Sequence, residues 1–293
     1  DNKMVRMLIN RAKTDPKKIV FAEADHIDVL KAAQVVYEEG IGFPILLGKK
    51  EVILELKNEL GFEADVPIID PKTPEEVTRR STFAKAYWES RQRRGISLFD
   101  AENLMRERNY FAAMMVNQGE ADALLSGYSR SYPSVVKPML QLIDKAPGVS
   151  LVATTNMMMT SRGPMFLSDT AINTNPTAEE LAKIAIMTSK VAKLFGVPPV
   201  IAMISFSNFG SSTNESASKV REAVAYLHKH HPDMIIDGEI QADFALNPEM
   251  LKAKFPFSKL AGKKVNTLIF PNLESANITY KLLKELNKVD SIG

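Results

Sequence analysis

The sequence predicts an α/β protein made of two domains, each with a mainly parallel sheet between layers of helices. Three observations lead to this prediction. The chain has 293 residues, which is long for a single hydrophobic core and sufficient for two. Short apolar runs of strand length alternate with longer stretches of helical periodicity. These runs are apolar throughout, which is typical of parallel strands that are buried on both faces.

The turn Ala146-Pro147-Gly148 is the expected boundary, so that the first domain spans residues 1–145 and the second 146–293. In the first domain we expect strands at 18–22, 43–47, 66–70 and 121–125. We expect helices at 28–39, 50–60, 74–94, 97–119 and 135–144. Because strands and helices alternate along the chain, the strands should form a parallel sheet that the helices cover.

The second domain shows the same alternation. We expect strands at 150–153, 166–169, 234–237 and 264–270, and another in the apolar first half of 200–212. We expect helices at 177–195 and 214–230 and a final helix after Pro271. Thr177 is followed three residues later by Glu180, a capping-box pattern that predicts the start of the first of these helices. The run Met157–Met159 is predicted to be strand core rather than a set of ligands.

A small polar loop lies between an apolar strand and a helix in the stretch V-I-A-M-I-S-F-S-N-F-G-S-S, residues 200–212. Backbone N–H groups of such a loop, together with the positive end of the helix dipole, commonly bind phosphate groups. A polar turn with a helix cap explains the same pattern equally well. The candidate ligand-binding residues of this loop are Ser207, Asn208, Gly210, Ser211 and Ser212.

A second strand-to-helix loop of similar composition spans residues 126–134. Its candidate residues are Ser126, Gly127 and Arg130, and Lys137 follows near the start of the next helix. We expect these two loops to form the two walls of one cleft. The basic stretch that contains Arg91 is interpreted as a solvated face, or as a source of one cation that reaches an anionic ligand.

Several classes of function are not supported by the sequence. It contains no cysteine, which excludes disulfides and thiolate catalysis and is consistent with a cytoplasmic protein. The formal net charge of +2 does not predict a nucleic-acid surface, and no apolar run reaches the length of a membrane span. Neither G-x-x-x-x-G-K-[ST] nor G-x-G-x-x-G occurs, so the common nucleotide-binding motifs are absent. The N-terminus lacks the long apolar region of a signal peptide.

No metal site is predicted. The histidines in H-K-H-H-P, residues 228–232, are better explained by a helix C-terminus than by a metal. Asp237, Glu239 and Asp243 follow one another after a strand. Carboxylates in this arrangement can bind Mg²⁺, but they are at least as well explained by pairing with Arg or Lys across a domain or subunit contact.

Several stretches together resemble the phosphate acetyltransferase family. They include A-D-A-L-L-S-G, D-T-A-I-N-T-N-P-T-A-E-E-L, S-F-S-N-F-G-S-S, D-G-E-I-Q-A-D-F-A-L and L-I-F-P-N-L-E-S-A-N-I-T-Y, in family order over nearly the whole chain. The loop S-N-F-G-S-S is most similar to the corresponding domain of bacterial multidomain NADP-dependent malic enzymes. The resemblance implies two α/β/α domains with an interdomain cleft, as in isocitrate and isopropylmalate dehydrogenases, and a homodimer or larger homo-oligomer.

The resemblance also implies the site. The family transfers acetyl between CoA and phosphate, with Ser, Arg and loop N–H groups stabilising the developing negative charge. Arg91 matches a ligand-binding Arg of the family, whereas Lys137 stands where the family has Arg, which weakens bidentate binding of phosphate. Arg130 is one turn earlier and could compensate. Family chains continue past the last helix and carry a Ser-Arg pair and an Asp there, so no catalytic base is assigned.

From this resemblance we expect an acetyl-CoA-sensing domain of an NADP-dependent malic enzyme. The start at Asp1 agrees with a domain cut from a longer polypeptide, whose malic-enzyme domain would hold NADP and a divalent metal. The expected ligands are acetyl-CoA or CoA and phosphate. The alternatives are an active phosphate acetyl- or butyryltransferase, a decarboxylating hydroxyacid dehydrogenase, and a purely structural role in an oligomer.

Overall fold

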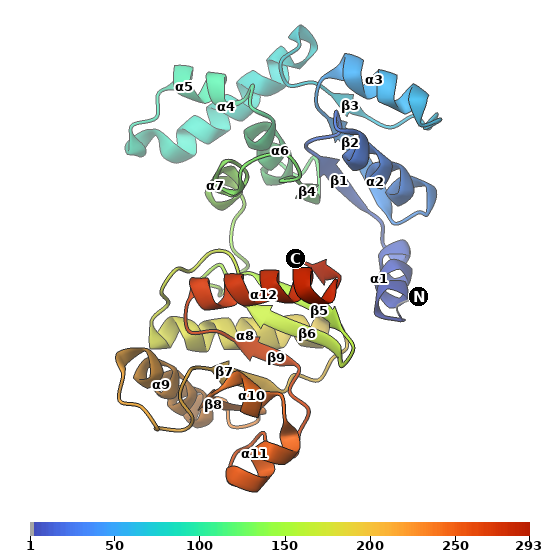
Figure 1. Cartoon of the computed structure of the whole chain (residues 1–293). Coiled ribbons are helices and arrows are strands. Elements are labelled where there is room, and N and C mark those ends of the chain that lie inside the picture. The colour runs from blue at the N-terminus through green and yellow to red at the C-terminus, as the bar shows by residue number, and fades with distance from the viewer. Residues whose placement is uncertain (1–2) are drawn as a thin grey trace. The chain divides into compact units, whose positions relative to one another are not determined.

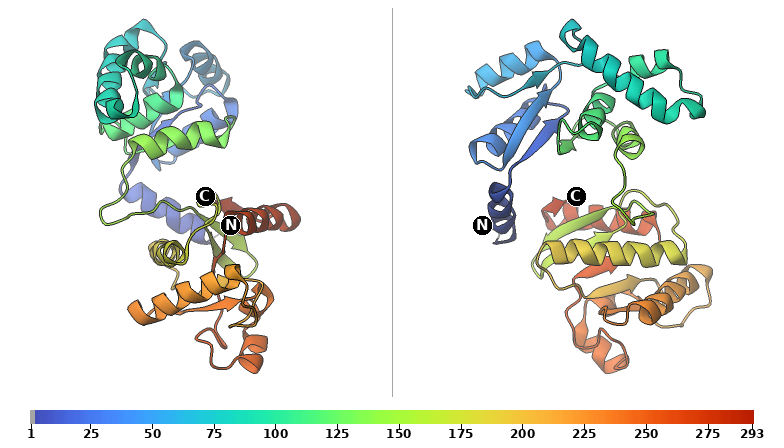
Figure 2. Two further views of the ribbon diagram at one scale, coloured as in Figure 1. Left: turned by 90° about the vertical axis from the view of Figure 1, so that its left-hand side faces the viewer. Right: turned by 180° about the vertical axis from the view of Figure 1, so that it is seen from behind.

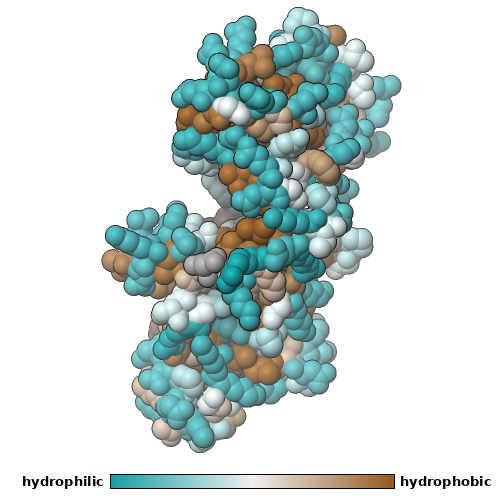
Figure 3. Space-filling model, turned by 90° about the vertical axis from the view of Figure 1, so that its right-hand side faces the viewer, coloured by the Kyte–Doolittle hydropathy of each residue, from teal (hydrophilic) through white to brown (hydrophobic). Residues whose placement is uncertain are grey.

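The computed structural model describes residues 3–293, which form two compact units (Figure 1). Unit 1 extends to Asp144 and unit 2 runs from Lys145 to Gly293. The limits expected from the sequence, 1–145 and 146–293, differ from this division by one residue. On the face shown in Figure 3, hydrophilic side chains cover most of each unit, with smaller apolar patches between them. Within the described part of the chain, no helix combines the length and apolar composition that crossing a bilayer requires.

Unit 1 is built on a parallel sheet with the strand order β3-β2-β1-β4. The strands are β1 (Lys17–Phe21), β2 (Gly42–Leu47), β3 (Ile68–Ile69) and β4 (Ala123–Leu125). β1 therefore lies between β2 and β4. The chain adds β2 and β3 on one side of β1 and then β4 on its other side. At such a reversal of strand order the carboxyl ends of parallel strands form the usual place for a ligand.

Helices cover both faces of this sheet (Figures 1 and 2). On one face, Phe21 and Leu46 pack against α2 (Ile27–Glu38) and α3 (Lys50–Glu59). On the other face, Val20 and Leu47 belong to a larger core with residues of four further helices. Those helices are α4 (Val77–Arg91), α5 (Leu98–Leu104), α6 (Arg108–Asn117) and α7 (Tyr132–Leu142). Alternate residues of each strand thus face opposite helix layers, as the period of two requires.

One long helix predicted in unit 1 is wrong. The helix expected at 97–119 is interrupted at Met105–Glu107, so that α5 and α6 are separate elements. The Glu107 carboxylate accepts the backbone N–H groups of Asn109 and Tyr110 at 3.0 and 3.1 Å and so caps α6. The expected helix at 74–94 is α4 with a short 3₁₀ turn at each end, Pro74–Glu76 and Gln92–Arg94. α1 (Lys3–Thr14) precedes the sheet.

Unit 2 has a six-stranded sheet with the order β10-β5-β6-β9-β7-β8. Its strands are β5 (Thr155–Thr160), β6 (Gly163–Ser168), β7 (Ile201–Ile204), β8 (Ile236–Ile240), β9 (Thr267–Ile269) and β10 (Ser291–Ile292). The four strands from β6 to β8 are parallel, whereas β5 and β10 are antiparallel to their neighbours. α8 (Ala178–Leu194) and α9 (Glu215–His230) cover one face. α10 (Ala242–Ala245), α11 (Pro248–Lys254) and α12 (Leu273–Asn287) cover the other.

The strand expected at 150–153 is wrong, because these residues are irregular. Leu151 and Ala153 are apolar because they pack against the core beneath α8 and α9. The strand begins instead at Thr155 and pairs with β6 across a two-residue turn, and Gly163, the first residue of β6, has a φ of +98°. Met157 and Met158 are buried strand core, as predicted.

Candidate active site

The loop after β4 binds an anion, and that anion is a side chain of the protein itself. Glu23 follows β1 and is only 2% exposed. One carboxylate oxygen accepts the N–H groups of Gly127 and Tyr128, both at 2.8 Å. The other accepts the N–H of Ser129 at 3.0 Å and its hydroxyl at 2.5 Å. The N–H groups of Gly127, Tyr128 and Ser129 are thus used by Glu23, and the binding of an external anion by this loop stays a prediction.

The charge on Glu23 is stabilised by this arrangement. Burial opposes ionisation of the carboxyl group, but the hydrogen bonds from Ser129, Tyr128 and Gly127 outweigh it and lower the pKa of Glu23. Gly127 has a φ of +104°, a conformation that glycine adopts without steric cost, and this lets successive N–H groups point at one carboxylate. An ionised Glu23 thus fixes the loop between β4 and α7.

Ser126 is held by a residue that the sequence analysis did not single out. Its hydroxyl donates to Oδ1 of Asn109 at 2.6 Å, and Asn109 is 1% exposed in the first turn of α6. Nδ2 of Asn109 has no hydrogen-bond partner among the described residues. A polar residue at the start of an otherwise apolar helix, R-N-Y-F-A-A-M-M, was the signal that could have identified it.

The basic candidates of unit 1 lie at three different places. Arg91 is the half-buried last residue of α4, Lys137 is exposed in α7, and Arg130 is exposed in the loop before α7. Within residues 3–293, the structure records no hydrogen bond between any two of them. Tyr87 and Tyr110 both donate to Gln141, which is one turn beyond Lys137 on α7.

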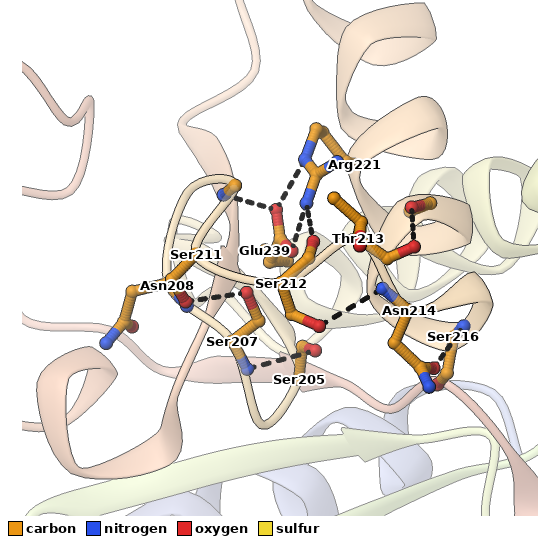
Figure 4. Close-up of polar contacts among 12 residues, drawn as sticks. Ser205, Ser207, Asn208, Ser211, Ser212, Thr213, Asn214, Ser216, Arg221 and Glu239 are labelled. Carbon is orange, nitrogen blue, oxygen red and sulfur yellow. Dashed lines mark hydrogen bonds and ion pairs between the residues drawn. The ribbon is translucent and has the colours of Figure 1, made fainter.

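In unit 2, the loop 207–212 follows β7, and most of its N–H groups are already hydrogen bonded (Figure 4). The N–H of Ser207 donates to the hydroxyl of Ser205, and the N–H of Asn208 to the hydroxyl of Ser211. The N–H groups of Phe209 and Gly210 donate to Glu239, and the N–H of Ser211 donates to the carbonyl of Asn208. The converging free N–H groups expected from the sequence are thus not found at residues 207–211.

Glu239 and Arg221 fix this loop through hydrogen bonds and an ion pair. Glu239, in β8, is fully buried, and its carboxylate pairs with the guanidinium of Arg221 at 2.9 and 2.8 Å. The same guanidinium donates to the carbonyl of Ser212 at 2.7 Å, so α9 is tied to the loop (Figure 4). The side chain of Arg221 remains 40% exposed, whereas Ser207 is 2% exposed and its hydroxyl is hydrogen bonded to that of Ser211 at 2.8 Å. Exposed side chains, rather than the bonded N–H groups of residues 207–211, are therefore what this loop offers to a ligand.

The acidic residues expected after a strand lie elsewhere: Asp237 and Glu239 are inside β8 and Asp243 is in α10, and all three accept hydrogen bonds within unit 2. Asp237 accepts the Ser258 hydroxyl at 2.9 Å and the Lys259 N–H at 3.0 Å. Glu239 pairs with Arg221 inside unit 2, and Asp243 accepts the N–H of Phe244 in α10. Across the part of the chain that the structure describes, no group of three His, Cys, Asp or Glu residues could hold a metal ion.

Comparison with known proteins places the chain in a family. The sequence profile described as phosphate acetyl/butaryl transferase matches residues 3–293. The chain belongs to this family. The resemblance predicted from the sequence motifs is therefore confirmed.

Individual phosphate acetyltransferases are similar to it over almost their whole length. The enzyme of Thermoanaerobacterium thermosaccharolyticum is 37% identical, over 99% of this chain and 89% of that protein. The crystal structure of a phosphotransacetylase from Streptococcus pyogenes, also 37% identical, covers 99% of this chain and 88% of that one with a TM-score of 0.90. The predicted α/β class with mainly parallel sheets is confirmed by this likeness. An NADP-dependent malic enzyme of Haemophilus influenzae is 34% identical over 99% of this chain, which spans 38% of that enzyme.

Proposed function

We propose that the protein is a phosphate acetyltransferase that transfers an acetyl group between CoA and phosphate. The observation that carries the proposal is 37% identity to a phosphate acetyltransferase across 99% of the chain and 89% of that relative. The sequence motifs favoured a regulatory domain of a malic enzyme, with catalysis as the alternative. The comparisons support the alternative better, because the phosphate acetyltransferase is 37% identical and the malic enzyme 34%.

The proposed reaction uses polar side chains of the two loops. The thiolate of CoA attacks the carbonyl carbon of acetyl phosphate, and phosphate leaves as the acetyl–sulfur bond forms. Negative charge develops on the carbonyl oxygen and on the departing phosphate, and positioned donors lower the barrier by stabilising it. The hydroxyls of Ser207, Ser211 and Ser212 and the exposed edge of Arg221 are the donors proposed in unit 2.

Unit 1 is proposed to supply the remaining cations, Arg91, Arg130 and Lys137. In this proposal the loops 126–134 and 207–212 both take part in binding CoA and phosphate, and two copies of the chain associate. The rigid support of both loops by buried carboxylates, Glu23 and Glu239, is in keeping with such a role, because catalytic donors must be held in place before the reaction.

An assay of acetyl-CoA formation from acetyl phosphate and CoA tests the proposal on the purified chain. We expect turnover that saturates in both substrates, and a comparison with butyryl phosphate gives the acyl preference. Ser211→Ala should lower kcat, since it removes a hydroxyl from the loop without charge change. Absence of turnover in a folded chain would contradict the proposal.

The second candidate function is an acetyl-CoA-sensing module of an NADP-dependent malic enzyme. It is favoured by the loop S-N-F-G-S-S and by the similarity of the whole chain to one part of the malic enzyme of Haemophilus influenzae. Titration with acetyl-CoA separates the two candidates. Binding of acetyl-CoA with no acetyl transfer supports the module, whereas binding with turnover supports the transferase. Sedimentation measurements would establish the proposed homo-oligomer.

A further inference from the structure

A pocket at the carboxyl edge of the unit 1 sheet gathers basic side chains. Five basic residues line it, and we call them the basic pocket: Lys49, Lys72, Arg106, Arg108 and Arg130. Lys49 lies in the loop after β2, Lys72 follows β3, Arg106 and Arg108 lie where α5 gives way to α6, and Arg130 follows β4. Residues from four separate segments therefore converge on one site, at the sheet edge where parallel α/β sheets bind ligands.

The two carboxylates that line the pocket, those of Asp70 and Glu107, accept hydrogen bonds from backbone N–H groups. Asp70 accepts the N–H of Lys72 at 3.0 Å and the N–H of Lys50 at 3.4 Å. Glu107 accepts the two N–H groups with which it caps α6. These carboxylates thus have structural partners, and no ion pair between them and the basic pocket is recorded within residues 3–293.

Among residues 3–293, Arg108 is the one cation of the basic pocket with a recorded ion pair. Arg108 makes a bidentate ion pair with Asp25, at 2.6 and 3.0 Å, and also donates to the carbonyl of Ala22. Gly48 permits this packing, because a Cβ added there would lie 2.7 Å from Cγ of Asp25. The Arg108–Asp25 pair is therefore a fixed wall of the pocket.

The other four cations have no such partner. For Lys49, Lys72, Arg106 and Arg130, the described part of the chain contains no recorded side-chain hydrogen bond or ion pair. Like charges held at one site repel one another and destabilise the fold. A multiply charged anion would remove that cost and could be bound by two lysines as point charges and by arginines in bidentate fashion.

We propose that the basic pocket binds a phosphate group, either inorganic phosphate or a phosphomonoester of a larger ligand such as CoA. Lys72 and Arg106 are the decisive residues, and neither is among the candidates assigned from the sequence. The proposal rests on the proposed binding of CoA and phosphate and adds Lys72 and Arg106 to the residues that take part in it. Its failure would leave the assay of acetyl-CoA formation unaffected, because that assay measures turnover of the native chain.

Calorimetric titration of the full chain with inorganic phosphate, CoA and 3′-dephospho-CoA tests the proposal. We expect the double variant K72Q/R106Q to bind the phosphate-bearing probe at least about tenfold more weakly, as loss of charge-assisted hydrogen bonds predicts. The matched control K31Q/K85Q removes two exposed lysines of unit 1 outside the pocket and should leave affinity unchanged. If K72Q/R106Q loses affinity for CoA but not for 3′-dephospho-CoA, the pocket binds the 3′-phosphate of CoA. If the variant loses affinity for inorganic phosphate, the pocket binds free phosphate.

Thermal unfolding of the same variants gives a second measurement. Without ligand, K72Q/R106Q should melt at the native temperature or above it, because two repelling charges have been removed, and phosphate should stabilise it less than the native chain. Three results would overturn the proposal: no phosphate-bearing probe binds the native chain, both double variants lose affinity equally, or K72Q/R106Q melts lower than the control without ligand.

Discussion

At the scale of single residues, buried carboxylates organise this protein. Glu23 and Glu239 lie under the two candidate loops, and Asp169 lies at the end of β6. Asp169 is 4% exposed and accepts the hydroxyl of Thr154 at 2.5 Å and the N–H groups of Ala171 and Asn173 at 3.0 and 2.8 Å. Sequence reasoning found the polar loops from their composition and singled out Glu239, but it found neither Glu23 nor Asp169, because nothing in a single sequence shows which acid a loop will enclose.

These carboxylates make the fold sensitive to acid. For Asp169, Asp25 and Glu23, burial alone would raise the pKa, but hydrogen bonds, and Arg108 in the case of Asp25, outweigh burial and lower it. The unfolded chain therefore takes up more protons as pH falls, so this stabilisation is complete above about pH 5 and is lost as pH falls through and below about 4.

Urea unfolding between pH 7 and pH 3 measures this effect. Asp169→Asn should cost about 1–3 kcal/mol at pH 7, because N–H groups lose a charged acceptor, and should reduce the loss of stability in acid. Asp233→Asn, at an exposed position, is the control and should change neither. Equal pH dependence in Asp169→Asn and the native chain would contradict the assignment.

At the scale of elements, most helices and parallel strands were predictable because their apolar periodicity is regular. The wrongly predicted elements lie where local hydrogen bonds determine the structure against the apolar periodicity of the sequence. Glu107 caps a new helix inside a stretch that reads as one helix, and β5 lies beyond the apolar run that suggested a strand. β10 was not predicted, since its residues, Ser291–Ile292, pair with β5 far away in the sequence. The capping pattern at Thr177 is present in part: its hydroxyl accepts the N–H of Glu180.

The tie between α9 and the loop 207–212 leads to a prediction at this scale. Arg221→Met should destabilise unit 2, because Glu239 would remain fully buried without its cation. Adding Glu239→Gln should recover part of the lost stability, since it removes the unpaired charge. Urea unfolding of the single and double variants measures both effects. A double variant less stable than Arg221→Met would show that the ion pair is not what holds the loop.

At the scale of the whole molecule, the chain consists of two compact units that meet at Asp144 and Lys145. Each unit has its own sheet, its own helix layers and its own hydrophobic clusters. The class was readable from length and alternation, and the Ala146-Pro147-Gly148 turn lies just after the division between the units. The candidate residues were assigned to both units, and resemblance rather than spacing linked them to one reaction.

The exposed connection between the units predicts where a protease cuts first. Residues 143–148 are exposed and irregular, and Lys145 lies among them. Brief digestion with trypsin should cut after Lys145 and give two fragments that each remain folded, because exposed irregular segments are the preferred sites of cleavage. Lys145→Gln should slow that cut. Early cleavage inside either unit, as read by mass spectrometry, would be inconsistent with this division.

The Glu23 carboxylate, finally, occupies an anion-binding site formed by a loop of the same chain. The substitution Glu23→Ala would remove the carboxylate and leave a small cavity into which three backbone N–H groups point. Formate or acetate added to the buffer should then bind in that cavity and restore part of the lost melting temperature, while chloride at equal ionic strength should not. With such chemical rescue, the stability of the variant would depend on the concentration of a small organic acid.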